Sequence, residues 1–320
     1  MEETKRHLVL VYDNRRMDPQ DFVEIARRIR ERAADIEVFI VDNLRRQRIS
    51  ARQAATRPSL IMCPFPLNSF KPDGGKIYQG QLTGKISQQR RFNEIGIPTP
   101  KWTVVDTNGG LDPAIWGPAV VVKPDFGRSG QNLALVRTEI VREYARSVKL
   151  PEPYGGQTNE MFAQSFVDTG NPMSFYRVLS FFSEALYCVL YSAQAPEEIS
   201  DLQRLPEGGV NIAVNSLSGL SVSLSDAPNV LNIARQVHDA LPGRPVLGID
   251  IVVDKATGEP LVLEANPSGN VWHLSSGLGR RVQRAYGFNP YKQFDALTVA
   301  ADALIRRTRS EATMDLVVAA

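Results

Sequence analysis

Residues 260–270 read PLVLEANPSGN, and this short stretch decides how the whole sequence is interpreted. The apolar run at 261–263 is typical of a buried strand, which then delivers Glu264 and Asn266 just before a Pro and a Gly turn the chain. A carboxylate buried at the end of a strand costs several kcal/mol unless a cation meets it. The stretch therefore raises the question of which cation that is.

The preceding strand supplies a second carboxylate. Residues 247–254 read LGIDIVVD, and the intervening DKATGEP is a hairpin turn, so we expect Asp250 to lie beside Glu264 and Asn266. Two carboxylates and a carboxamide, without His or Cys, form an oxygen set that suits Mg²⁺, which takes its other ligands from water and nucleotide phosphates. Alone, either acidic residue could simply cap a turn at a strand end.

A lysine and a glycine loop add a phosphate-binding signal. In VVVKPDFGRSGQ, residues 120–131, Lys123 ends a strand and can project at a phosphate, while the loop with Gly127, Ser129 and Gly130 folds over it as a backbone anion cradle. The alternative is a surface lysine at a hairpin. GQLTGKI, residues 80–86, fails the Walker A spacing, and no glycine fingerprint follows the first strand, which excludes a nicotinamide-binding Rossmann site.

The order of elements predicts three units. Residues 1–80 alternate strands and a helix as a small parallel α/β domain does. Residues 81–155 hold a helix at 85–95 and the hairpin with the glycine loop. The third unit, residues 156–320, begins with three successive strand patterns typical of an antiparallel sheet, at 161–167, 175–182 and 184–194. It ends in amphipathic helices at 275–286 and 291–309. The fold class is thus α/β followed by α+β.

Composition excludes several classes of protein. A chain of 320 residues with 43% hydrophobic and 22% charged residues is that of a folded soluble protein, and the net charge of +2 indicates neither a nucleic-acid nor a membrane partner. The arginine run between Arg45 and Arg57 lacks interleaved aromatics and is interpreted as a solvated face. Cys63 and Cys188 are expected to be reduced core residues, and without a signal peptide or membrane-spanning run we expect a cytoplasmic protein.

Six segments in order resemble the ATP-grasp superfamily, specifically its ribosomal-protein glutamate ligase and glutathione synthetase-like branch. They are GKISQQRRFNEIGIPTPKW, VVVKPDFGRSGQ, MFAQSFVDTG, FYRVLSFF, LGIDIVVD and VLEANPSGN. The resemblance spans roughly residues 75 to 290, and each motif is weak alone. It implies an ATP-grasp fold, with a small N-terminal domain and two α+β subdomains that enclose ATP.

The resemblance also implies roles for individual residues. Lys85 and Lys123 look like the two lysines on the ATP phosphates, and Arg177 resembles an arginine facing the substrate carboxylate or acyl phosphate. Near the adenine and ribose it places Gln164, Phe166, Val167 and Asp168, although Ser174 and Phe175 stand where the family often has the ribose carboxylate. Asp250, Glu264 and Asn266 match the ligands of Mg²⁺, or of Mn²⁺ in its place.

The implied reaction joins a carboxylate substrate to an amine with ATP, through an acyl phosphate, releasing ADP and phosphate. Arg204 stands where relatives have a second basic residue, with a mobile surface arginine as the alternative. Trp272 and His273 depart from the pattern: they could wall the substrate pocket, with His273 accepting a proton, or Trp272 could be core and His273 a helix cap.

Two other classes of function stay open from the sequence. One is a phosphotransferase that stops at a phosphorylated product, and the other is a nucleotide-binding regulatory module. The apolar faces of the C-terminal helices could also meet a second copy of the chain.

Overall fold

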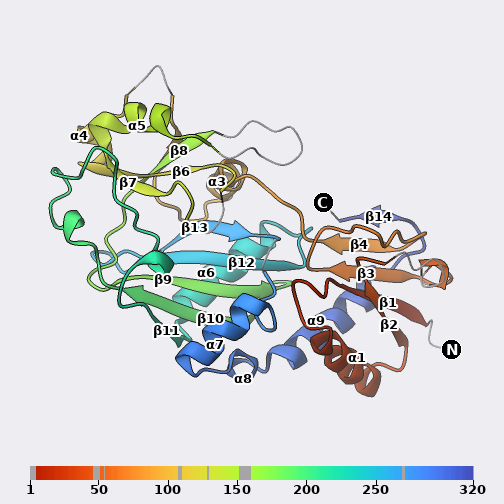
Figure 1. The fold of residues 1–320 in the computed structure, drawn as a ribbon. Helices are drawn as coiled ribbons and strands as arrows, with labels where there is room; N and C mark the ends of the chain where they lie inside the picture. The colour runs from red at the N-terminus through yellow and green to blue at the C-terminus, as the bar shows by residue number, and fades with distance from the viewer. Residues whose placement is uncertain are drawn as a thin grey trace.

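The computed structural model describes residues 5–45, 51–53, 55–106, 110–127, 130–150, 160–268 and 271–319, and its elements form three sheets (Figure 1). The first sheet has the strand order β14-β4-β3-β1-β2 and all its pairs are parallel. Its strands are β1 (Arg6–Tyr12), β2 (Ile36–Asp42), β3 (Ser59–Cys63), β4 (Lys76–Gln79) and β14 (Val317–Val318). The parallel sheet expected for the N-terminal part of the chain is confirmed.

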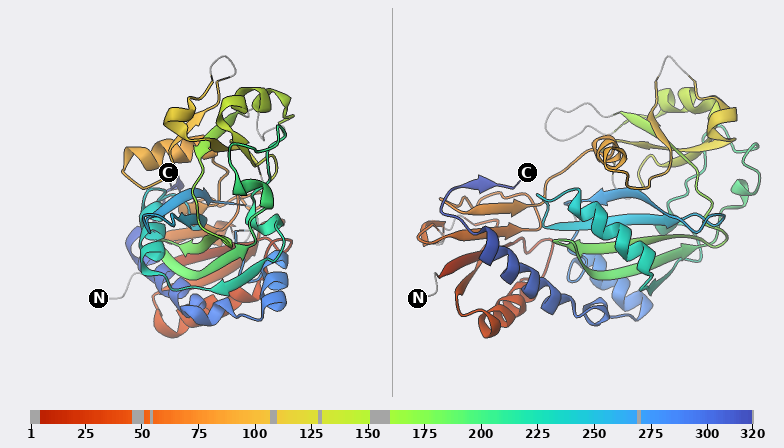
Figure 2. Two further views of the ribbon diagram at one scale, coloured as in Figure 1. Left: turned by 90° about the vertical axis from the view of Figure 1, so that its left-hand side faces the viewer. Right: turned by 180° about the vertical axis from the view of Figure 1, so that it is seen from behind.

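Helices from opposite ends of the chain cover this first sheet. Helix α1 (Gln20–Arg32) packs with its face of Phe22, Ile25 and Ile29 inward, because these residues recur at helical spacing. Helix α9 (Ala296–Glu311) lies beside α1 and also contacts β10, so it joins the first sheet to the next (Figure 2). The C-terminal segment then adds β14 at the edge of the first sheet.

The second sheet is antiparallel and forms the centre of the molecule, in the order β11-β10-β9-β12-β13. Its strands are β9 (Met173–Phe181), β10 (Glu184–Ala193), β11 (Ser221–Leu224), β12 (Val246–Val253) and β13 (Pro260–Asn266). Helix α6 (Pro228–Asp239) packs its apolar face against this sheet. Helices α7 (Gly277–Tyr286) and α8 (Pro290–Gln293) follow β13 and lie below the sheet in Figure 1.

The third sheet is small and lies above the central sheet in Figure 1. It has the order β5-β8-β6-β7, from β5 (Trp102–Val104), β6 (Ala119–Pro124), β7 (Ala134–Arg137) and β8 (Met161–Ser165). Three helices accompany it, namely α3 (Lys85–Glu94), α4 (Pro113–Trp116) and α5 (Val141–Ser147). The hairpin β6–β7, with the glycine loop between its strands, is antiparallel as expected.

One strand belongs to a different sheet from the one the sequence indicated. The pattern grouped 161–167 with the two strands that follow, but β8 pairs with β5 and β6 of the small sheet. Alternation of apolar residues shows that a segment is a strand without naming its neighbour, because pairing is set by contacts distant in sequence. No helix in the described part of the chain has the length and apolar character to span a bilayer.

Candidate functional site

The two acidic residues of the hairpin β12–β13 lie opposite one another where the central sheet meets the small one. Asp250 of β12 and Glu264 of β13 are Cα partners, and Asn266 is opposite Gly248. The ladder is interrupted at this point: Val262 pairs with Ile251 and Glu264 with Asp250, so one residue, Leu263, is inserted as a β-bulge. The bulge places Glu264 on the same side of the sheet as Asp250.

Arg177 of β9 pairs with Asp250 from the other side. The two residues are cross-strand partners, and the guanidinium donates to both carboxylate oxygens, from Nε at 2.7 Å and Nη2 at 2.6 Å. Burial raises the pKa of Asp250, and the charge of Arg177 offsets only part of that effect. Arg177 thus contacts an expected metal ligand, and the expectation that it faces a substrate group stays a prediction.

Two lysines from the small-sheet side face Glu264. Lys85 Nζ lies 3.8 Å from Glu264 Oε2, and Lys123, at the end of β6, is 5% exposed with its ammonium over the Phe162 ring. Burial lowers the pKa of Lys123 to about 8, with the charge of Lys85 acting in the same direction and Glu264 against it. Burial tends to raise the pKa of Glu264, but the charges of Lys85, Lys123 and Arg177 and the hydrogen bond from Asn266 together outweigh it, so the pKa is lowered.

Asn266 bridges the carboxylates through its amide nitrogen. Its Nδ2 lies 3.2 Å from Glu264 Oε1 and 3.5 Å from Asp250 Oδ2. Turning the amide over would present Oδ1 to the same point. No cluster of three His, Cys, Asp or Glu side chains suited to a metal occurs within the described ranges, so a thiolate or imidazole centre is not formed there. Two carboxylates with a carboxamide beside them fit Mg²⁺ once the amide oxygen is turned towards the ion.

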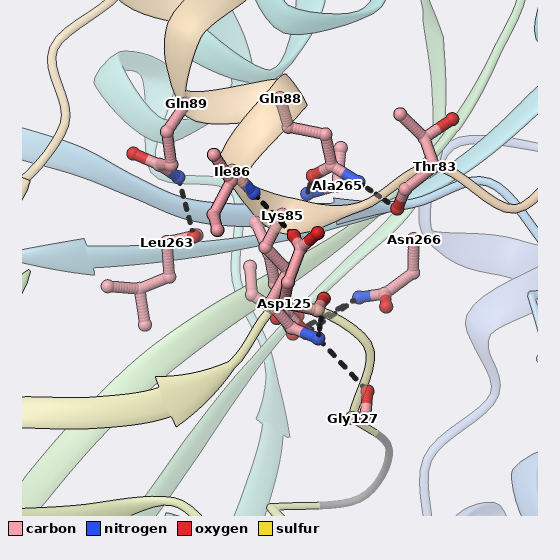
Figure 3. Close-up of polar contacts among 12 residues, drawn as sticks. Thr83, Lys85, Ile86, Gln88, Gln89, Asp125, Gly127, Leu263, Ala265 and Asn266 are labelled. Carbon is pink, nitrogen blue, oxygen red and sulfur yellow. Dashed lines mark hydrogen bonds and ion pairs between the residues drawn. The ribbon is translucent and has the colours of Figure 1, made fainter. Parts of the chain in front are cut away.

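Helix α3 is joined to the glycine loop by Asp125, a residue the sequence analysis did not single out. Asp125 Oδ1 accepts from the Ile86 backbone N–H at 2.7 Å, which caps the first turn of α3 (Figure 3). Lys85 Nζ donates to the carbonyl oxygens of Asp125 and Gly127, at 3.3 and 3.0 Å. Asp125 follows Lys123 and Pro124 directly, but nothing in the sequence shows that its carboxylate reaches a helix 40 residues earlier.

Part of the glycine loop and the residues expected near adenine lie within the described part of the chain. Gly130 has φ +72°, in the left-handed region that favours glycine, and Ser129 lies outside the described residues. Gln164 of β8 is buried, and its Nε2 has no hydrogen-bond partner in the described part of the chain. Phe166 and Val167 follow β8 and are half-buried.

Asp168 is exposed and closes a turn by accepting from the Gly170 N–H at 2.8 Å. Its carbonyl oxygen accepts from the Lys255 N–H, also at 2.8 Å. The contacts described for Asp168 are thus those of a turn, and its expected role near the ribose stays a prediction.

Arg204 and His273 differ in how they relate to this cluster. The Arg204 side chain is 87% exposed and pairs with Asp201, and none of its contacts among the described residues is with Asp250, Glu264 or Arg177. His273 lies in the field of Arg177: burial, aided by that charge, lowers the pKa of His273 to about 3. Helix α7 is capped by the Ser276 hydroxyl, so the interpretation of His273 as the helix cap is wrong.

Trp272 is a core residue. It is fully buried, packs edge-on against Phe22 and Phe181, and donates from Nε1 to Asp21 at 2.6 Å. The interpretation as core is therefore confirmed, and a pocket wall at this residue is not formed.

Comparison with known proteins identifies the fold. No protein-family model matches the chain, and no curated protein matches its sequence. Among solved structures, the D-cycloserine synthetase DcsG matches with 14% identity and a TM-score of 0.52, covering 94% of this chain and 99% of that one. The ATP-grasp ligase PsnB, complexed with a minimal precursor, matches with 11% identity and a TM-score of 0.52, covering 95% of this chain and 100% of that one.

This chain has the ATP-grasp fold. The likeness extends over nearly the whole chain, and the mixed parallel and antiparallel architecture agrees with the expectation from the sequence. In this ATP-grasp chain, Lys85 and Lys123 come from the small-sheet side, while Asp250, Glu264, Asn266 and Arg177 come from the central sheet. The glutamate-ligase branch that the motifs resemble stays a prediction.

Proposed function

We propose that this protein is an ATP-dependent ligase that joins a carboxylate to an amine through an acyl phosphate. The observation that carries the proposal is the meeting of a buried carboxylate, Asp250, and a half-buried one, Glu264, with three cations between two sheets. The cations are Lys85, Lys123 and Arg177. Such a set can hold the phosphates of ATP and offset charge on a transferring phosphoryl group. Two neighbours of the same fold support it: DcsG is a synthetase, and PsnB is a ligase solved with Mg and ADP.

In the first step, a carboxylate oxygen of the substrate attacks the γ-phosphorus of ATP, and the bond from that phosphorus to the ADP oxygen breaks. Lys85 and Lys123 would hold the phosphate oxygens, and Asp250, Glu264 and Asn266 would hold Mg²⁺ or Mn²⁺. When bound, the metal would offset charge on those oxygens. Gly127, Ser129 and Gly130 would cover the phosphates, and the groups expected near adenine and ribose are Gln164, Phe166, Val167 and Asp168.

In the second step, the amine nitrogen attacks the acyl carbon, the bond from that carbon to the phosphate oxygen breaks, and the proton lost by the nitrogen goes to the departing phosphate. Arg177 would stabilise the departing phosphate, and we propose that Arg204 approaches it with the substrates bound. Because the pKa of His273 is about 3, its imidazole is unprotonated at neutral pH but is a weak base. This favours a hydrogen bond from the amine to His273 over complete proton transfer.

The test is release of ADP and phosphate from Mg²⁺–ATP in the presence of pooled amino acids and small carboxylates. We expect turnover that needs one acid and one amine together and that is lost in Glu264→Ala. Hydroxylamine should trap the acyl phosphate as a hydroxamate. A phosphorylated product without a hydroxamate would instead establish a phosphotransferase, and ATP binding without turnover in any pool would favour a regulatory module.

A further inference from the structure

The outer edge of β13, the strand that carries Glu264 and Asn266, is closed by α3 and the turn that follows it. β13 is the last strand of the central sheet, so its outward backbone groups have no strand partner among the described residues. The Val262 N–H donates instead to the carbonyl oxygen of Pro98, at 2.9 Å. Two glutamines of α3 take the next positions along the same edge (Figure 3).

Glu264 faces the candidate site only because of the bulge beside it. Val262 and Ala265 both belong to the apolar cluster under the sheet, with two residues between them. In a regular strand, side chains alternate, and Glu264 would lie on the same face as Val262, inside that cluster. The inserted Leu263 reverses the alternation and turns Glu264 towards Asp250.

Gln88 and Gln89 hold the backbone on each side of Glu264. Gln89 Nε2 donates to the carbonyl oxygen of Leu263, the bulged residue, at 3.0 Å, and Gln88 Oε1 accepts from the Ala265 N–H at 2.9 Å. Gln88 Nε2 also donates to the carbonyl oxygen of Thr83, at 3.2 Å. The two side chains are 3% and 0% exposed.

Packing alone does not explain why residue 89 is a glutamine. The amide oxygen of Gln89 is buried and has no hydrogen-bond partner among the described residues. The hydrogen bond described for this side chain is the one from Nε2 to the carbonyl oxygen of Leu263. A half-satisfied buried amide costs free energy that an apolar side chain of similar volume would not. The contact with the bulge accounts for the presence of a glutamine at this position.

We propose that Gln88 and Gln89 are positioning residues that lock β13 in its bulged register and so aim Glu264 at the metal. The inference rests on the proposed function and deepens it, since it assigns the groups that build the cation site. Residues that orient metal ligands typically affect metal affinity about 10- to 100-fold when replaced.

The experiment compares Gln88→Met, Gln89→Met and the double variant with the wild type. Methionine keeps the length of the side chain and removes its hydrogen bonds. Mn²⁺ binding in the presence of ADP is followed by electron paramagnetic resonance of free Mn²⁺, and ADP binding in EDTA and the thermal midpoint are measured beside it. Gln236→Met, an exposed glutamine on α6, is the matched control.

We expect the double variant to bind Mn²⁺ about 10- to 100-fold more weakly, with metal-free ADP affinity unchanged and the control equal to the wild type. Unchanged Mn²⁺ affinity in the double variant would overturn the inference and leave the glutamines as edge caps. Equal losses of Mn²⁺ and metal-free ADP affinity would also overturn it, because they indicate a general loss of structure. A wild type that binds no Mn²⁺ with ADP would overturn the proposed function itself and this inference with it.

Discussion

Single side chains in this protein owe their chemistry to burial as much as to charge. Lys123 is nearly inaccessible to water, and its ammonium is supported by Glu264 and opposed by Lys85. Burial penalises the charged form of an ionisable group, which lowers the pKa of a lysine. Two histidines, His238 and His273, are held neutral for the same reason.

Lys123 should make nucleotide binding depend on pH. Its pKa of about 8 means that the positive charge is lost as the pH rises through 8, so ATP affinity of the free protein should fall between pH 7 and 9. In Lys123→Arg the guanidinium stays charged, and this dependence should disappear. Equilibrium binding at several pH values checks it, with Lys101→Arg, an exposed lysine, as the control. A wild-type affinity that is constant over this range would contradict the assignment of Lys123.

His238 should make the fold sensitive to acid. Its Nδ1 lies 2.7 Å from Ser180 Oγ and its Nε2 2.9 Å from the Arg244 carbonyl oxygen, and burial lowers its pKa to about 4. Between pH 4 and the pKa of about 6.5 that a histidine has in an unfolded chain, the unfolded chain binds more protons than the folded protein. The contribution of His238 to the free energy of unfolding is therefore complete above pH 6.5 and is lost as the pH falls towards 4. The loss from His238 corresponds to roughly 3 kcal/mol.

Urea denaturation between pH 7 and pH 4 measures this effect. His238→Gln, which cannot titrate, should show a shallower loss of unfolding free energy with falling pH. Some dependence should remain, because the pKa of His273 is lowered in the same direction. Parallel slopes for the wild type and the variant would show that His238 does not control acid stability.

At the scale of elements, α3 depends on a neighbour for its start. Its N-cap residue, Gly84, has no side chain to accept from the first turn, and Asp125 at the end of β6 does so instead. A Cβ at residue 84 would lie 2.5 Å from Asp125 Oδ2, so the close approach requires glycine. The helix that carries Lys85, Gln88 and Gln89 is thereby tied to the strand that carries Lys123.

Gly84→Ala should weaken this junction. The added methyl group displaces the Asp125 carboxylate and leaves the Ile86 N–H unpaired, which should lower the free energy of unfolding by about 1–2 kcal/mol. Chemical denaturation measures the change. Gly208→Ala, where a Cβ meets nothing within 4 Å, is the control and should stay within about 0.5 kcal/mol of the wild type. Equal effects at the two glycines would contradict the close approach seen at Asp125.

At the scale of the whole molecule, Asp21 joins the N-terminal unit to the chain after β13. Its carboxylate accepts from Trp272 Nε1 at 2.6 Å, Ser275 Oγ at 2.5 Å and the Tyr291 hydroxyl at 2.9 Å. Burial raises the pKa of Asp21, with the three hydrogen bonds acting against it. Asp21 lies in the first turn of α1, and its carboxylate is the centre of this interface.

Asp21→Ala should destabilise the whole molecule. The change leaves two buried donors and one half-buried donor, the Tyr291 hydroxyl, without this acceptor, which should cost about 3 kcal/mol. The thermal midpoint and the urea midpoint check this, with Asp302→Ala as the control because Asp302 forms an exposed ion pair with Arg32 worth less than about 1 kcal/mol. A loss no larger than that of the control would show that the interface does not depend on Asp21.

The sequence by itself determined most of the elements, the fold class and the residue types of the candidate site, but it indicated one helix at 291–309 where the structure has two, α8 and α9. Periodicity located the strands around Asp250 and Glu264, and the short turn between them required a hairpin, so their proximity followed from local rules. The order of the motifs added Lys85, Lys123 and Arg177. The division into units at residues 80 and 155 stays a prediction.

Only the tertiary structure decided how those residues are aimed. The partner of β8, the bulge at Leu263, the pairing of Arg177 with Asp250 and the reach of Asp125, Gln88 and Gln89 all join segments distant in the sequence. Alternation in a strand gives a face only while the ladder is regular, and one inserted residue reverses it. A single sequence carries no local signal for such an insertion, because it is stabilised by side chains on another element.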